Sequence, residues 1–213
     1  MRRLRTPRIA ALALLTAGLA ACDATPLPLG MERGTELFET CAPCHGANAA
    51  GNPDIAAPAI AGLPQWYIED QLRGYQEGYR GDHYTDLAGL RMRPMALSLT
   101  REGDIESVAE YVAGLDPVYP ESTLHGNAGA GATMYTQICV ACHGVDGLGM
   151  PELHAPPIVQ LNDWYLYQEL QNFRSGARGA APGDTWGLTM RANSLALSDE
   201  VMQDVIAYVQ TLR

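Results

Sequence analysis

One motif occurs twice in this chain, and both occurrences lie within a longer repeat. Residues 41–46, CAPCHG, recur 98 positions later as residues 139–144, CVACHG. The same displacement holds without a gap as far as Leu99, which aligns with Leu197, and it aligns tryptophan, proline, glycine and methionine positions in between. Two copies of this length predict a tandem pair of small domains, because a solenoid needs three or more shorter units.

The register of the repeat shifts by one residue on either side of this stretch. After Thr100 the displacement becomes 97, so that Tyr111 aligns with Tyr208. Ahead of the motifs, Phe38 stands three residues before the first cysteine of its copy, whereas Tyr135 stands four residues before its own. The copies are therefore duplicates that differ by one residue at each end.

Each copy is predicted to be helical. The segment ahead of each motif lacks proline and carries its two cysteines at helical spacing. Residues 65–78 and 162–176 predict a second helix that ends at glycine, where a left-handed cap is favoured. A last helix follows Thr100 or Ser198 as N-cap, with acidic residues in its first turn and apolar residues at i, i+3, i+4 and i+7. No segment alternates long enough to predict a strand, so the expected fold class is all-α.

The N-terminal residues are typical of an export signal. Four arginines precede an uncharged apolar run from Ile9 to Ala21, which is too short to span a bilayer comfortably. Two prolines stiffen the join between the copies, which is expected to be a linker. The predicted organisation is a signal peptide at 1–21, an anchor and spacer at 22–30, a first domain at 31–116, a linker at 117–125 and a second domain at 126–213.

Cys22 follows the apolar run directly and has no partner in the repeat. The sequence Leu-Ala-Ala-Cys at 19–22 resembles the lipobox of bacterial lipoproteins, in which the cysteine is acylated and becomes the first residue of the mature chain. Two or more acyl chains would hold the protein at a membrane surface. Asp23 suggests, by the same resemblance, retention at the outer face of the inner membrane. The alternative is ordinary cleavage near Ala20, which leaves Cys22 as a free thiol.

The pattern C-x-x-C-H is the attachment sequence of c-type haem. Two thiols one helical turn apart form thioethers with the haem vinyl groups, and the adjacent histidine then reaches the iron. The sequence therefore predicts two covalently bound haem c groups, and the residues concerned are Cys41, Cys44 and His45 in the first copy and Cys139, Cys142 and His143 in the second.

Three other uses of paired cysteines fit less well. A zinc ribbon needs its second cysteine pair about 15–20 residues on. A redox dithiol of the thioredoxin kind follows a strand, whereas the segments here are predicted helices. A disulfide between residues three apart would stabilise very little. Haem also explains how small domains with only two Phe and three Trp fill a core, since the porphyrin is itself a large apolar body.

The sixth iron ligand is expected late in each copy. Met92 and Met190 coincide under the displacement of 98, and His/Met ligation fills both axial positions and raises the reduction potential. Met95 aligns with Asn193 and ranks second. His83 remains an alternative ligand for the first haem. The other unmatched histidines, His125 and His154, are expected to be surface or loop residues, as His83 would otherwise be.

Four further residues are candidate haem contacts. We expect the carbonyl groups of Pro58 and Pro156 to support the iron-binding histidines, and Arg80 and Arg178 to pair with haem propionates. Each has a plainer alternative, because proline also forms turns and arginine is also a solvated surface residue.

The charge of the chain restricts its partners. Removal of residues 1–21 takes away four of the 14 basic residues and none of the 24 acidic ones, which leaves a net charge of −14. This acidity argues against nucleic-acid binding, which needs cationic charge. It favours partners with positive docking surfaces, and association with them should weaken with salt.

Taken together, the paired CAPCHG and CVACHG motifs, the segments QWYIEDQLRGYQEGYRG and DWYLYQELQNFRSGARG, and the endings with Met and a terminal helix resemble di-haem class I cytochromes c of the cytochrome c-four type. The resemblance covers residues 31–213. It implies two cytochrome c folds related by a pseudo-twofold axis, with the propionate edges near the interface. It also implies a periplasmic electron carrier that delivers electrons to haem-copper oxidases. The loop ahead of Met92 departs from its counterpart in the second copy.

The predicted function is therefore single-electron transfer between a donor of the quinol-cytochrome c reductase type and a terminal oxidase or reductase, without a small-molecule substrate. One alternative is a cytochrome subunit dedicated to a membrane dehydrogenase. A different class is a di-haem enzyme, a peroxidase or a thiosulfate-oxidising cytochrome, which needs an open, labile or His/Cys-ligated iron.

Overall fold

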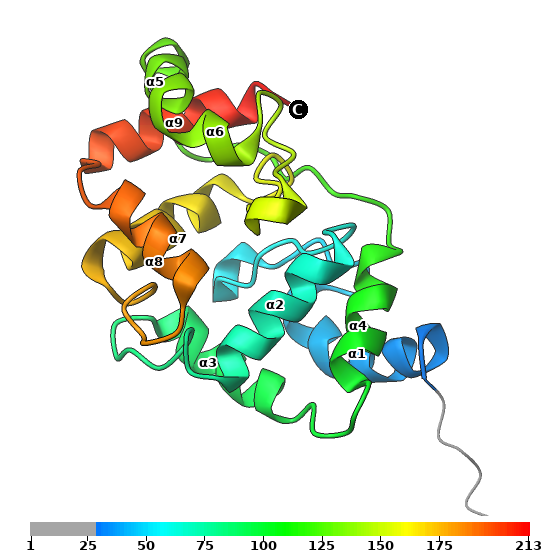
Figure 1. The fold of residues 1–213 in the computed structure, drawn as a ribbon. Helices are drawn as coiled ribbons and strands as arrows, with labels where there is room; N and C mark the ends of the chain where they lie inside the picture. Colours follow the sequence, from blue (N-terminus) through cyan, green and yellow to red (C-terminus); the bar gives the residue numbers. More distant parts are fainter. Residues whose placement is uncertain (1–28) are drawn as a thin grey trace, which may run out of the picture.

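The computed structural model of the chain describes residues 29–213, so the predicted signal peptide and Cys22 lie outside the described residues. This part of the chain consists of helices and loops, with isolated β-bridges and no strand (Figure 1). The first domain contains α1 (Met31–His45), α2 (Gln65–Gln76), α3 (Leu87–Leu97) and α4 (Asp104–Ala113). The second contains α5 (Ala128–Met134), a π-helical turn (Tyr135–Cys139), α6 (Val140–His143), α7 (Asp163–Ser175), α8 (Thr185–Ser194) and α9 (Asp199–Gln210). The predicted all-α fold is confirmed.

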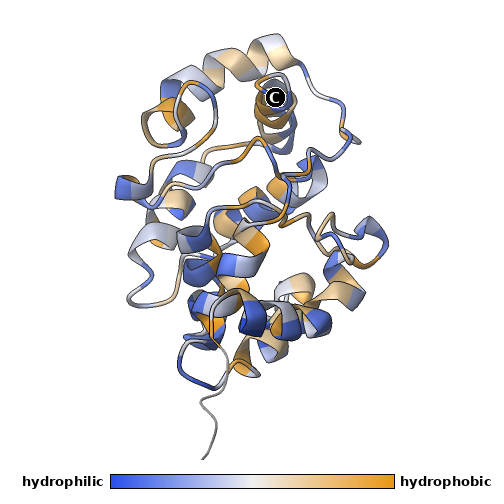
Figure 2. Cartoon of the chain, turned by 90° about the vertical axis from the view of Figure 1, so that its right-hand side faces the viewer, coloured by the Kyte–Doolittle hydropathy of each residue, from blue (hydrophilic) through white to orange (hydrophobic). Residues whose placement is uncertain are grey.

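The helices are amphipathic, and Figure 2 shows hydrophobic and hydrophilic residues on the same helices. On α4, Ile105, Val108 and Val112 are buried, whereas Glu106 and Glu110 are exposed. This is the spacing that the sequence predicts for a helix with one face on the core. In the described residues no helix is both long and apolar enough to cross a membrane.

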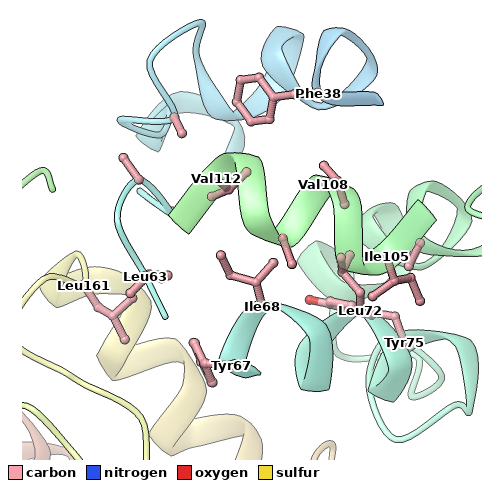
Figure 3. Close-up of a cluster of buried hydrophobic side chains, with 14 residues drawn as sticks. Phe38, Leu63, Tyr67, Ile68, Leu72, Tyr75, Ile105, Val108, Val112 and Leu161 are labelled. Atoms are coloured by element: carbon pink, nitrogen blue, oxygen red, sulfur yellow. The ribbon is translucent and has the colours of Figure 1, made fainter. Parts of the chain in front are cut away.

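The terminal helices of each domain cross at very short range. A Cβ atom added to Gly34 of α1 would lie 2.2 Å from the Ser107 oxygen of α4. A Cβ atom added to Gly131 of α5 would lie 1.9 Å from the Asp204 oxygen of α9. Both glycines are buried, so the two crossings depend on the absence of a side chain. The core of the first domain lies around its crossing, where Phe38 packs beside Val108 and Val112 (Figure 3).

A π-helical turn absorbs the one-residue difference ahead of the motifs. In the first domain α1 runs without a break to His45. In the second, Tyr135–Cys139 form a π-helical turn between α5 and α6. A π-helical turn holds one residue more than an α-helical turn. Tyr135 and Phe38 consequently occupy equivalent places, because both are buried and their rings lie 5.3 Å and 5.1 Å from the rings of Tyr208 and Tyr111.

The last helices of the two domains, α4 and α9, have different N-caps. Ser198 is the N-cap of α9, and its side chain accepts a hydrogen bond from the amide of Val201, as predicted. The prediction of Thr100 as the N-cap of α4 is wrong, because α4 begins at Asp104 after Gly103. Gly103 has a φ of 86°, and this left-handed conformation prevents a helix from starting earlier. Of the two predicted helix-ending glycines, Gly176 is the left-handed cap of α7, whereas α2 already ends at Gln76.

The domains are joined across a buried interface. The amide of Ala59 donates to the Asn162 side chain at 2.8 Å, and Leu161 packs into the core cluster of the first domain near Leu63 (Figure 3). Arg80 contacts position 169, and Arg178, its counterpart in the repeat, contacts position 71. Contacts that exchange under the repeat in this way are those of a twofold relation between the two copies.

Candidate functional site

The first motif lies at the end of α1. Cys41 is half-buried, Cys44 is exposed, and His45 is buried with its Nδ1 atom 2.9 Å from the Pro58 carbonyl oxygen. Burial lowers the pKa of His45, although the Pro58 carbonyl opposes the shift, so the imidazole is neutral at pH 7. A neutral ring that donates from Nδ1 leaves its Nε2 lone pair for a metal ion, an arrangement common among histidine ligands.

The second motif repeats this geometry after the π-helical turn. Nδ1 of His143 lies 3.0 Å from the Pro156 carbonyl oxygen, and burial again lowers the histidine pKa against the opposing effect of that carbonyl. Cys139 and Cys142 are both half-buried. Each domain thus holds two thiols and one oriented imidazole at the end of its motif helix.

An apolar pocket opens beside the first motif. Cys41, His45 and Met92 line it together with apolar side chains of α1, α2 and α4, and the members that also belong to the core are Phe38, Ile68, Leu72, Val108 and Val112. A predominantly apolar wall with a thiol and an imidazole fits a porphyrin that is held through sulfur and nitrogen. The structure therefore brings Met92 of α3 into the same pocket as His45.

Met95 also lines this pocket, three residues beyond Met92 on α3, although it is 40% exposed. His83 does not line it. Nδ1 of His83 is hydrogen-bonded to the Thr85 side chain at 2.8 Å, and its ring stacks on that of Tyr84. In the second domain Met190 occupies the matching position on α8 and is half-buried.

The other two unmatched histidines lie away from the motifs. His154 Nδ1 lies 2.7 Å from Asp70 Oδ2, and its ring stacks on Trp186, so it joins the two domains at the edge of their interface. His125 lines a shallow surface hollow near the start of α9.

Arg80 and Arg178, predicted as propionate partners, meet at the domain interface. Arg80 donates to Gln71 at 2.8 Å and to Glu169 at 2.9 Å, and Arg178 donates to Glu169 and, at 3.2 Å, to Gln71. The Nε atoms of both arginines are buried and have no hydrogen-bond partner among the described residues. The cluster holds two guanidinium groups but only one carboxylate, and two of its N–H donors are unused. Such a cluster is suited to bind further carboxylates such as haem propionates.

Several polar residues beside these sites were not predicted from the sequence. Glu169 and Gln71 align in the repeat, and their difference in charge was the available signal. Arg93 and Arg191 follow the paired methionines directly, and each has a buried Nε atom without a partner among the described residues. The signal for them was the repeated Met-Arg dipeptide.

Comparison with known proteins identifies both halves of the chain as cytochrome c domains. The cytochrome c family model matches residues 31–116 and 128–213. A thiosulfate dehydrogenase electron acceptor from Stutzerimonas stutzeri (strain A1501) is 30% identical over 79% of this chain and 76% of its own length. The cbb3-type cytochrome c oxidase subunit FixP from Bradyrhizobium sp. (strain ORS 278) is 30% identical over 90% of this chain and 68% of its own length.

Among solved structures, reduced recombinant cytochrome c4 from Pseudomonas stutzeri is similar to this chain. The similarity covers 87% of this chain and 100% of the cytochrome c4 chain, with a TM-score of 0.67 and 25% identity. Two family matches, one in each domain, imply two covalently bound haem c groups, one beside each C-x-x-C-H motif. The chain belongs to the cytochrome c family and is a di-haem electron carrier whose structure is similar to that of cytochrome c4.

Proposed function

We propose that residues 31–116 and 126–213 are the two haem-binding domains, joined by a linker at 117–125. Thioether attachment falls to Cys41 and Cys44 in the first domain and to Cys139 and Cys142 in the second. His45 and His143 are the proximal iron ligands, oriented by the carbonyls of Pro58 and Pro156. Met92 and Met190 are the distal ligands, and Arg80 and Arg178 bind propionates.

The protein acts as a carrier rather than as an enzyme. Haem c, when bound, supplies a one-electron Fe(III)/Fe(II) couple. The observation that carries the proposal is that Met92 lines the same pocket as His45 and Cys41. With haem bound, the Met92 thioether and the His45 imidazole would both be available to the iron, so no position would be left for a substrate. Electron transfer would then need no change of ligands, and the apolar side chains of the pocket would keep water away from the haem.

A ligand-binding assay tests this proposal. Cyanide added to the oxidised protein should bind slowly and weakly at both domains, because it must displace a methionine. Rapid, tight binding at one domain would contradict the carrier proposal and favour a peroxidase or a thiosulfate-oxidising enzyme. If that domain were the first, a Met92→Ala variant with unchanged cyanide binding would show that Met92 is not its ligand, and His83→Ala would then test the alternative.

The relatives indicate the kind of partners. One is named as the electron acceptor of a thiosulfate dehydrogenase, and another as a subunit of a cbb3-type oxidase. We propose that this chain accepts electrons from a dehydrogenase or quinol-oxidising complex and passes them to a haem-copper oxidase. Stopped-flow reduction by thiosulfate dehydrogenase with thiosulfate, followed by oxidation with a cbb3-type oxidase, tests each half separately. Failure with both enzymes would contradict the proposed partners.

We also propose export to the periplasm and attachment of the mature chain to the outer face of the inner membrane through lipidated Cys22. The basic and apolar residues at 1–21 and the cysteine that follows them support this location. Mass spectrometry of the mature N-terminus tests it. A diacylated or triacylated Cys22 is the expected result, and an unmodified peptide beginning at Ala21 or Cys22 would rule out the anchor.

A further inference from the structure

The interface cluster of Gln71, Arg80, Glu169 and Arg178 is symmetric in position but not in charge. The displacement of 98 relates Arg80 to Arg178 and Gln71 to Glu169. Each guanidinium group contacts both position 71 and position 169, so the four side chains form one closed cluster across the two domains. The first domain contributes a neutral amide where the second contributes a carboxylate.

The cluster is buried and held in a fixed arrangement. The side chains of Arg80, Glu169 and Arg178 are 7%, 12% and 11% exposed. The guanidinium of Arg80 lies 4.5 Å from the centre of the Tyr75 ring, and that of Arg178 lies 4.4 Å from the centre of the Phe173 ring. Tyr75 and Phe173 are themselves related by the repeat, so both arginines are stacked in the same way.

Glu169 is ionised in this setting. Burial alone would raise its pKa, but the charges of Arg178 and then of Arg80 outweigh burial and lower the pKa below its usual value. The cluster therefore contains two positive charges and one negative charge at any pH near neutrality. Charges that are removed from water act over longer distances than charges on the surface, because the interior screens them less.

The position of Glu169 relative to its own domain follows from the repeat. Gln71 lies on α2 next to Leu72, which lines the pocket of the first domain. Glu169 lies at the matching place on α7 of the second domain. The second haem site therefore has a buried negative charge at a position where the first has none.

We propose that Glu169 sets part of the difference between the reduction potentials of the two haem groups, with Gln71 as its neutral counterpart. The proposal rests on the binding of one haem c in each domain. A nearby negative charge stabilises Fe(III) relative to Fe(II), so Glu169 lowers the potential of the second centre relative to the first. In the singly reduced protein it shifts the electron toward the first domain.

Four full-length, haem-loaded proteins test this proposal: the wild type, Glu169→Gln, Gln71→Glu and the double variant that carries both changes. Spectroelectrochemical titration gives two one-electron potentials for each protein. The mean potential should rise in Glu169→Gln, fall in Gln71→Glu and stay unchanged in the double variant, which keeps one carboxylate.

The difference between the two potentials is the decisive quantity. Both single variants make the cluster symmetric, so the difference between the two potentials should be the same in both. This difference, taken with its sign, should lie midway between the value for the wild type and the value for the double variant. The difference in potential should change by about 59 mV from the wild type to either single variant, and by the same amount again from either single variant to the double variant. A change of 59 mV corresponds to a tenfold change in the distribution of one electron between the haems.

An identical difference in all four proteins would overturn the proposal, including the case in which only the mean potential moves. The double variant guards against a folding failure of Glu169→Gln, since it retains the carboxylate between the two arginines. If Glu169→Gln does not fold, the wild type and the double variant decide the question by themselves. Haem content and visible spectra report separately whether both haems are attached, so a failure of the proposed haem sites is distinguished from a failure of this proposal.

Discussion

The imidazole Nδ1 of His45 lies 2.9 Å from the carbonyl oxygen of Pro58 and donates its proton to that oxygen, which leaves Nε2 directed away from the backbone. The same contact joins His143 and Pro156 at 3.0 Å in the second domain. Because a carbonyl can only accept, the contact fixes the tautomer as well as the orientation of the ring. Both histidines are thus prepared for metal binding in the same way.

The distal ligands are expected to be separable by mutation. Met92→Ala and Met190→Ala should each remove about half of the sulfur-to-iron charge-transfer absorption of the oxidised protein, because each would remove one of the two proposed thioether ligands. Met95→Ala is the matched control in the first domain, and it should leave the absorption unchanged. Full absorption in Met92→Ala together with a loss in Met95→Ala would reverse the assignment of the first ligand.

The helix crossings should tolerate no side chain. Gly34→Ala and Gly131→Ala should each lower the free energy of unfolding by about 1–3 kcal/mol, because the new Cβ atom meets backbone oxygen at 2.2 Å or 1.9 Å. Gly74→Ala is the matched control on α2, where the nearest atoms lie 3.9 Å from the added Cβ atom. It should be neutral or stabilising, as alanine favours the helix. Denaturant unfolding of the haem-loaded proteins measures the free energy of unfolding of all three variants. An equal change in all three would contradict the close contact of the helices at Gly34 and Gly131.

The linker should be sensitive to acid. The carboxylate of Asp163, which is 1% exposed, accepts hydrogen bonds from the amides of Thr123 and Leu124 and so fastens the linker to α7. Burial raises the pKa of Asp163, but the amides of Leu124 and Thr123 outweigh it and lower the pKa below 3.8. The stabilisation is therefore complete above pH 3.8 and is lost as the pH falls through the lower value in the folded protein.

The Asp163→Asn variant tests whether the stabilisation by the Asp163 carboxylate is lost as the pH falls. At pH 7 the variant should be less stable than the wild type by about 1–3 kcal/mol, since a buried charged acceptor is lost. The gap between the two proteins should narrow as the pH falls below 3.8, because the wild type then loses the same carboxylate. Limited proteolysis of residues 117–125 at neutral pH provides the local measurement. A gap that stays constant with pH would show that Asp163 does not titrate in this role.

Reaction with partners should depend on salt. The mature chain predicted from the sequence has ten basic and 24 acidic residues, and a partner with a positive docking surface is attracted to it at a distance. The second-order rate constant for electron transfer to a haem-copper oxidase should fall as the ionic strength rises from 10 to 300 mM. A rate constant that is independent of salt would contradict electrostatic docking.

Much of the fold was predictable because the duplication itself carries the information. The helical spacing of Ile105, Val108 and Val112 predicted the buried face of α4, and the repeat predicted that Met92 and Met190 are equivalent. The start of α4 was not predictable from Thr100, because the left-handed turn at Gly103 depends on tertiary context. The π-helical turn was visible only as an extra residue, since the sequence does not indicate how a helix accommodates it.

The interface was the least predictable part of the candidate site. Arg80 and Arg178 were identified from the repeat, but their common contact with Glu169 depends on how the two domains pack. A sequence gives the composition of each copy and contains no direct record of which faces meet. The difference in charge between Gln71 and Glu169 is visible in the repeat, but the contact of Glu169 with both arginines is visible only in the structure.

One redox titration of the purified protein, monitored by visible absorption, decides whether both haem sites are closed. Two one-electron steps, both at the high potentials typical of His/Met ligation and both from six-coordinate centres, are the predicted result. One high-potential step accompanied by a low-potential or five-coordinate centre would contradict the assignment of this chain as a carrier with two closed haem sites.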